Sequence, residues 1–524
     1  MRIDAGCWLG ICAGFSIIEP GHDQGSSDMD ANTNTLTRSL GLLPLAATGI
    51  CSMLGAAIYV VPLMIQRNVP GIGPYVLPAY LLAALPAILA AIAYAMLSSA
   101  MPTSGGSYVF ASRALHPYLG FVASFSQWFG LSIAIGVVSY LLIPFLRDVS
   151  ATLGWLSLAG SLEGGLPRVL LALAFLWLFV VINLRGVRLY ARVVVPLMFM
   201  MFALGVLVIV VGFHFDRQDF AAAVLARGEP AVAASTPSAF HLPSFLAASA
   251  LLFSSFIGFD AIAQAGGEAR NPGRTLPLAI GIAVVTVGTF YLLFTAAVYH
   301  AVPWSYIARE AMNRDLTAPG LLGYLLPAGW TAAMIAGAAA ALINDLPAML
   351  LAVSRLMFAW GEDGIFPRQV ARVHPRWQTP HVALLASGAM ASVGIVGSHL
   401  AGDFFLGVDL LLTSMLVNFL LMCLSVLVLP WRNPGLARRA RVLKTRTAQL
   451  FVSLFGSVLL GGFLVVHLWK DVTADEAAWY FHATPLWLAV MATGTVIYAH
   501  QTRRMRRVGI DLEQRFSTLS ELAE

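Results

Sequence analysis

Long uncharged apolar stretches alternate with short polar segments along most of the chain. Each stretch holds roughly 20 residues, enough for a helix to cross about 30 Å of hydrocarbon. Placing the breaks at charged, Pro and Gly clusters predicts twelve membrane-spanning helices, numbered 1 to 12 below. Their predicted ranges are 42–63, 75–97, 118–146, 168–184, 193–214, 243–265, 277–300, 328–358, 382–400, 404–430, 450–469 and 483–501.

The composition excludes a water-soluble protein. Of the 524 residues, 59% are hydrophobic and 11% charged, against a charged fraction of about 25% in soluble domains. The four cysteines, Cys7, Cys12, Cys51 and Cys423, lack the spacing of a zinc site and the density of a disulfide scaffold. The formal net charge of +5 comes from basic residues between the apolar stretches, so membrane topology explains it better than nucleic-acid binding.

The basic residues also predict the orientation in a cell membrane, either a plasma membrane or a bacterial inner membrane. Twelve spans return both termini to one side, and Lys and Arg accumulate in cytoplasmic segments. With cytoplasmic termini, most of the 31 Lys and Arg residues lie inside. Those left outside are Arg67, Arg147, Arg168, Arg217, Arg227, Arg309, Arg314 and Lys470. We therefore expect residues 1–41 to be a cytoplasmic extension and residues 502–524 a cytoplasmic tail.

The start of the chain leaves three alternatives open. Residues 5–18, AGCWLGICAGFSII, are too short for a comfortable span, and no small-residue cleavage site follows them. They form a signal-like segment, an interfacial helix, or part of a disordered upstream extension whose natural start is Met29. We favour the extension, which the intact mass of the native protein would decide.

Helices 1 and 6 each carry a weak-helix patch near mid-depth. Gly49, Ser52 and Gly55 cluster in helix 1, and residues 253–260, FSSFIGFD, lie at the matching place in helix 6. Irregular backbone at membrane depth is tolerated where it lines a protein cavity. Patches five spans apart are the arrangement expected of inverted repeats whose broken helices meet at a binding site. The alternative is that these small residues only let helices pack closely.

Acidic residues at membrane depth are the other candidates for function. Asp260 follows the helix 6 patch, and a carboxylate at this depth costs about 2.5 to 3.5 kcal/mol, so it normally faces a cavity, a partner or a proton path. We expect it to carry a proton, with a structural ion pair as the alternative. Asn344 and Asp345 lie near the middle of helix 8, before Pro347. They serve a cation, a proton or an amine, or else form a buried hydrogen-bonded pair that holds helix 8.

Five segments in order make the chain resemble the amino acid/polyamine/organocation transporter superfamily, which includes the amino acid permeases. SMLGAAIYVVP (52–62) resembles the helix 1 signature of that superfamily, and SFIGFDAIAQAGGEARNPGRTLPLAI (255–280) its helix 6 signature. The other similar segments are PTSGGSYVFASRALHPYLGF (102–121), NLRGVRLYAR (183–192) and SRLMFAWGEDGIFPRQVARVHPRWQTP (354–380).

The resemblance implies an all-α membrane fold of twelve helices, with helices 1 and 6 discontinuous. Residues 42–214 would form a first repeat of five helices and residues 243–430 a second, inverted one. Residues 450–501 would supply two peripheral helices. No cofactor or metal is implied, and the assembly is expected to be a monomer or a homodimer.

The resemblance also assigns a substrate site to the two patches. Amides of the helix 1 patch would hold the substrate carboxylate, which agrees with the positive end of a half-helix dipole. Carbonyls of both patches would hold the ammonium group, and the side-chain pocket would fall between helices 1, 3, 6, 8 and 10. The expected binding residues are Met53, Leu54, Gly55, Ala56, Ala57, Phe253, Ser254, Ile257 and Gly258, with Asp260, Asp345 and Asn344 for coupling or gating.

The function implied is secondary transport of an amino acid or related organic amine by alternating access, with proton symport or exchange. Two rivals are a transporter-like amine sensor and a membrane-embedded enzyme. The enzyme would need a nucleophile, base or metal set with suitable spacing, which the sequence does not present, and no G-x-x-x-x-G-K-[ST] nucleotide motif occurs. The expected partners are the small-molecule substrate, protons and the lipid bilayer, without nucleic acid.

Overall fold

A computed structural model describes most of the chain as helix. The described residues are 36, 38–55, 57–162, 165–230, 239–314, 316–401, 405–474, 482–511, 515–516 and 519. Most of the predicted N-terminal extension therefore lies outside them. In the described part there is no sheet, and the extended backbone makes only two isolated bridges, Leu40 with Ala269 and Ser104 with Ala265.

Eleven helices in the described residues are long and apolar enough to cross a membrane, which confirms a multi-pass membrane protein. Helix 1 consists of α2 (Leu42–Leu54) and α3 (Ala57–Asn68), and helix 2 of the short turn η1 (Gly73–Tyr75) and α4 (Val76–Ala100). Helix 3 is α6 (Pro117–Thr152), helix 4 is α8 (Gly165–Leu184) and helix 5 is α9 (Val187–His214). Helix 6 consists of α11 (Leu242–Leu252), η2 (Phe253–Phe256) and α12 (Asp260–Gln264). Helices 7 to 11 are α13 (Pro272–Ala301), α16 (Ala328–Asp363), α17 (His381–Ala401), α18 (Phe405–Arg432) and α20 (Arg446–Val472).

The predicted twelfth span lies in α21 (Ala483–Arg507), which is helical but is not among these eleven. Its sequence mixes Thr484, Thr493, Thr495 and His500 with apolar residues before the basic end. This mixture weakens the apolar signal that a span needs. The twelve-helix count thus stays a prediction.

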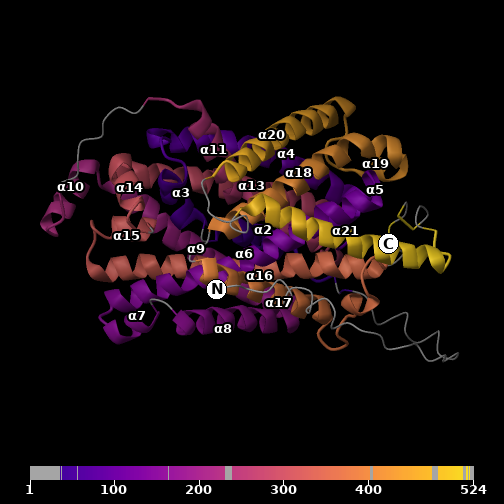
Figure 1. Ribbon diagram of the computed structural model, residues 1–524, viewed down its shortest axis with the longest axis horizontal. Helices are drawn as coiled ribbons and strands as arrows, with labels where there is room; N and C mark the ends of the chain where they lie inside the picture. The colour runs from indigo at the N-terminus through magenta and orange to yellow at the C-terminus, as the bar shows by residue number, and fades with distance from the viewer. Residues whose placement is uncertain are drawn as a thin grey trace. The chain divides into compact units, whose positions relative to one another are not determined.

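Helices 1, 3, 6, 8 and 10 are the most enclosed spans. The apolar window of helix 1 is 100% buried and that of helix 8 is 89% buried, whereas helices 4 and 5 are each 28% buried. Helix 3, α6, packs against α16, α17 and α18. Figure 1 shows α8 alongside α17, with which it is in contact. Helices 4 and 5 leave large apolar side chains exposed, including Leu170, Phe199 and Val210, as expected of faces that meet lipid.

Short helices and ion pairs hold the two ends of the bundle. They are α5 (Gly106–Ala114), α7 (Leu156–Leu162), α10 (Arg217–Ala226), α14 (Trp304–Ala311), α15 (Ala318–Leu322) and α19 (Pro434–Arg439), with 3₁₀ turns η3 (Gly266–Glu268) and η4 (Arg368–Ala371). At one end α14 and α15 pack on α3, and the hydroxyls of Tyr306 and Tyr324 donate to Glu229 at 3.2 and 2.6 Å. Burial raises the pKa of Tyr306, so its hydroxyl stays a donor.

Two buried ion pairs lie at the other end, where helix 1 begins. Arg355 of α16 pairs with Glu268 of η3 at 2.5 Å, with both side chains at most 1% exposed. Arg113 of α5 pairs with Asp363 at 2.6 Å. The backbone amide of Leu40, just before α2, donates to the Glu268 carbonyl at 2.9 Å. Helix 8 is therefore tied to the segment after helix 6, and that segment to the start of helix 1.

Candidate functional site

Helix 1 is interrupted where the sequence predicts a weak patch. Its first half, α2, ends at Leu54, and Gly55 then leaves helical geometry, with φ −42° and ψ −137°. The second half, α3, begins at Ala57, and Ala56 lies outside the described residues. The carbonyl of Met53 accepts a hydrogen bond from the Tyr291 hydroxyl at 3.0 Å. A carbonyl has two lone pairs, so Met53 keeps acceptor capacity for a ligand.

Helix 6 is interrupted at the matching patch. After α11 the chain makes the 3₁₀ turn η2, Ile257 is extended (φ −74°, ψ 133°), and Gly258 has φ 135°. An L-residue rarely adopts that φ. Helix α12 then starts at Asp260. The Ser254 hydroxyl donates back to the Leu251 carbonyl at 2.7 Å, in the last turn of α11.

The two interruptions touch each other through backbone. A Cβ placed on Gly258 would lie 2.4 Å from the Ser52 carbonyl oxygen and 2.8 Å from the Met53 amide nitrogen. Real Cβ atoms do not approach other atoms this closely. Gly258 is therefore the residue that lets the helix 6 break rest on the helix 1 break.

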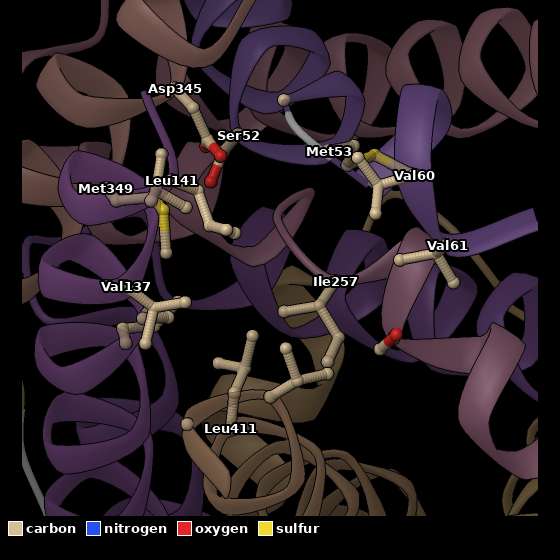
Figure 2. Close-up of a pocket in the computed structure, with 17 residues that line it drawn as sticks. Ser52, Met53, Val60, Val61, Val137, Leu141, Ile257, Asp345, Met349 and Leu411 are labelled. Carbon is tan, nitrogen blue, oxygen red and sulfur yellow. The ribbon is translucent and has the colours of Figure 1, made fainter. Parts of the chain in front are cut away.

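A cavity of about 90 Å³ lies beside this contact (Figure 2). Its walls come from helices 1, 3, 6, 8 and 10, the five that the family resemblance implies. The described lining residues are Ser52, Met53, Gly55, Val60, Val61, Leu131, Ala134, Val137, Val138, Leu141, Ser254, Ile257, Asp345, Met349, Gly407, Val408 and Leu411. In Figure 2, Asp345 and Ser52 meet at the top of the cavity and Leu411 lies at the bottom, with aliphatic side chains between them.

Asp345 brings a carboxylate into this mostly aliphatic cavity. The residue is 6% exposed, and its Oδ1 has no hydrogen-bond partner within the described structure. Its carboxylate lies against the helix 1 break, because a Cβ on Gly55 would fall 2.1 Å from Asp345 Oδ2. A buried carboxylate without a partner is costly, so this one is suited to a ligand that carries donors or positive charge.

Asp260 is held by a polar network and does not line the cavity. It accepts hydrogen bonds from the Gly258 amide at 3.1 Å and from the Gln127 side-chain amide. Gln127 Oε1 in turn accepts from Ser107 at 2.5 Å and from Asn418 at 2.9 Å. The carboxylate thus braces the helix 6 break against helix 3, and its role in coupling stays a prediction.

Asn344 also points away from the cavity. Its side-chain amide donates to Cys51 Sγ at 2.8 Å and to the Val194 carbonyl at 3.5 Å. This arrangement joins helix 8 to helices 1 and 5. Its Oδ1 has no hydrogen-bond partner among the described residues.

Seven of the nine expected binding residues divide into two groups; Ala56 and the side chain of Ala57 lie outside the described part of the chain. Met53, Gly55, Ser254 and Ile257 line the cavity together with Asp345, whereas Leu54, Phe253 and Gly258 do not. Phe253 packs its ring against Phe419 and Phe463 instead. The binding roles of all these residues stay predictions.

Most of the cavity wall was missed by sequence reasoning. On α6 the lining residues Leu131, Ala134, Val138 and Leu141 recur at helical spacing, but the whole helix is apolar and one face gives no separate signal. Ser52 was predicted to belong to the break in helix 1, but it was not predicted to line the cavity. Met349, one turn after Asp345 on helix 8, was recoverable from helical spacing alone.

No metal site is formed by the described residues, since no group of three or more His, Cys, Asp or Glu side chains gathers in a way that could hold an ion. The site therefore offers backbone groups, two serine hydroxyls and one carboxylate. Such groups bind and release a small solute without covalent chemistry.

The fold and the site define a multi-pass membrane protein in which two interrupted helices meet beside a cavity lined by helices 1, 3, 6, 8 and 10. Residues 40–495 match the model of the amino acid permease family. The chain belongs to that family.

Individual relatives are similar over most of their length. The chain is 25% identical to the methylthioribose transporter of Bacillus subtilis (strain 168), covering 90% of this chain and 95% of that protein. It is 26% identical to the branched-chain amino acid permease BcaP of the same organism, covering 77% and 83%. It is 24% identical to the low-affinity putrescine importer PlaP of Escherichia coli (strain K12), covering 84% and 91%. The family and these relatives are transporters, not enzymes.

Proposed function

We propose that this protein is a secondary active transporter that moves an amino acid or related organic amine across a cell membrane by alternating access. The observation that carries the proposal is the backbone contact between the two breaks, where Gly258 packs on Ser52, beside a cavity lined by helices 1, 3, 6, 8 and 10. Irregular backbone at membrane depth is stable only where protein or a polar ligand satisfies it. The site therefore suits a small polar solute.

The repeat arrangement, the orientation in the membrane and the driving force in this proposal are taken from the sequence. Helices 1–5 and 6–10 form inverted repeats, consistent with breaks that lie five spans apart. Both termini are cytoplasmic, so the Arg355–Glu268 pair lies at the cytoplasmic end of the bundle. Transport is driven by proton symport or by exchange. The relatives are named for a methylthioribose, branched-chain amino acids and putrescine, which supports a small organic solute without selecting one.

Counterflow in proteoliposomes tests the proposal. Vesicles loaded with each member of a panel of amino acids and amines are mixed with a trace of the same labelled solute, with and without a pH gradient. We expect at least one solute to accumulate transiently, and protein-free vesicles to show none. A solute that binds the purified protein without being exchanged by the vesicles would contradict transport and favour the amine sensor.

A further inference from the structure

Asp345 is the one acidic side chain among the described lining residues of the cavity. It is 6% exposed and its Oδ1 has no partner in the described structure. By contrast, the carboxylate of Asp260 has two donors, and that of Glu268 is paired with Arg355. Asp345 is therefore left to be satisfied by whatever enters the cavity.

The carboxylate also occupies a particular place. It lies against Gly55, immediately before the N-terminus of α3, a helix of 12 residues. The positive end of that helix dipole attracts an anion. Because the protein's own carboxylate already stands there, the helix 1 break is a poor site for the carboxylate of a substrate.

Nothing else along the described lining compensates for this negative charge. The lining contains no Lys, Arg or His, and its remaining polar side chains are the hydroxyls of Ser52 and Ser254. The opposite walls are aliphatic, with Val137, Ile257 and Leu411 facing the space (Figure 2). When Asp345 is ionised, a second carboxylate would meet repulsion from it and no cation. An ammonium group would meet an unpaired carboxylate.

The volume limits the size of the occupant. A cavity of about 150 Å³ holds benzene, a molecule of six heavy atoms. At about 90 Å³, this cavity therefore favours the smaller of two solutes. The amine is smaller than the amino acid with the same carbon chain, so size and charge act in the same direction.

We infer that the cavity selects a compact aliphatic amine, whose ammonium group pairs with Asp345, over the α-amino acid of the same carbon chain. The inference rests on the proposed function and narrows its substrate class. Asp345 supplies the charge that recognises the amine, and the aliphatic walls on helices 3, 6 and 10 receive its carbon chain. Gly55 is required because any side chain there would fill the space of the carboxylate.

Calorimetry on the full chain in lipid nanodiscs tests this inference, since uncharged amines cross lipid unaided and would obscure uptake measurements. The probes are 3-methylbutylamine against leucine and 2-methylpropylamine against valine, pairs that differ only by the carboxylate. We expect each amine to bind at least about tenfold more tightly than its amino acid, and Asp345→Asn to weaken amine binding by about tenfold to a hundredfold. Asp345→Ser serves as a second variant if Asp345→Asn does not fold.

Asp148→Asn is the matched control, because Asp148 is partly exposed near the end of α6, where it pairs with Arg147. It should leave both affinities unchanged. Tighter binding of the amino acids by the unmodified protein, or an unchanged amine-to-amino-acid ratio in Asp345→Asn, would overturn the inference while counterflow could still support transport. In the proteoliposome counterflow described above, an Asp345→Asn protein that still exchanges its solute and loses only its response to a pH gradient would also overturn the inference, because Asp345 would then carry a proton.

Discussion

Two glycines, Gly55 and Gly258, are the positions where one added methyl group most directly disturbs the site. At Gly55 the methyl group meets the Asp345 carboxylate, and at Gly258 it meets the Ser52 carbonyl. The first neighbour is a side chain that can shift, whereas the second is backbone that cannot. Gly258 also has φ 135°, which strains any L-residue.

We expect Gly55→Ala to keep the fold, at a cost of about 1 to 3 kcal/mol for overpacking, and to reduce ligand binding by displacing Asp345. Gly258→Ala adds backbone strain of about 1 to 3 kcal/mol and should lower the yield of folded protein more strongly. Thermal unfolding in detergent and ligand binding measure the two effects. Gly281→Ala is the control, since a Cβ there meets nothing within 4 Å. Equal loss of stability in all three variants would contradict the contacts described.

Substitution of Asp260 tests whether transport is coupled to protons. If this carboxylate carries the coupled proton, Asp260→Asn removes the stimulation of uptake by an inward proton gradient and spares exchange of substrate between the two sides. The measurement is uptake into proteoliposomes over a range of external pH, with Asp148→Asn as control. Unchanged pH dependence in Asp260→Asn would leave Asp260 as a brace that Gln127 and the Gly258 amide hold in place.

At the scale of elements, the buried pair Arg355–Glu268 ties helix 8 to the segment that follows helix 6. Removing one partner leaves an unpaired buried charge, so Glu268→Gln and Arg355→Gln should each cost about 3 to 5 kcal/mol. The double variant should be more stable than the two losses added together predict. Thermal unfolding of the four proteins measures this coupling.

The partly exposed ion pair Arg147–Asp148 serves as the comparison for the buried pair. Its side chains are 35% and 38% exposed, so Asp148→Asn should cost at most about 1 kcal/mol. Strictly additive losses at Arg355 and Glu268 would show that the two charges do not stabilise each other.

The elements themselves were largely predictable from the sequence. Each predicted range from 42–63 to 450–469 falls on a span of the structure, because a stretch that must satisfy its backbone in lipid has to be helical. The interruptions were predictable as well, since Gly49, Ser52 and Gly55 cluster in helix 1 and Ser254, Ser255 and Gly258 cluster in helix 6. Gly and Ser favour helices less than Ala or Leu. The contact between Gly55 and Asp345 was not, because it depends on how helix 8 is rotated against helix 1. Sequence spacing within one helix carries no information on that angle.

At the scale of the whole molecule, the membrane arrangement rests on which helices are enclosed and which face lipid. The five enclosed helices line the cavity, and helices 4 and 5 expose apolar faces. The orientation and the twelfth span remain to be measured. Labelling of single cysteines introduced at exposed positions measures both the orientation and the twelfth span. The native Cys51 and Cys423 are buried and should not react, and Cys7→Ser and Cys12→Ser remove the other two native cysteines.

We expect Gln218→Cys, after helix 5, and Thr473→Cys, after helix 11, to react with a membrane-impermeant maleimide from outside intact cells. Arg503→Cys, at the end of α21, should react only after the membrane is opened. All three residues are exposed. Labelling of Thr473→Cys and Arg503→Cys from the same side would show that α21 does not cross the membrane.

The seating of Gly258 on the Ser52 carbonyl has a mechanical consequence. Because no free space separates the two backbones at this point, a movement of either unwound segment toward the other must displace it. In the proposed transport cycle, a shift of one break in that direction would therefore be passed on to the other break.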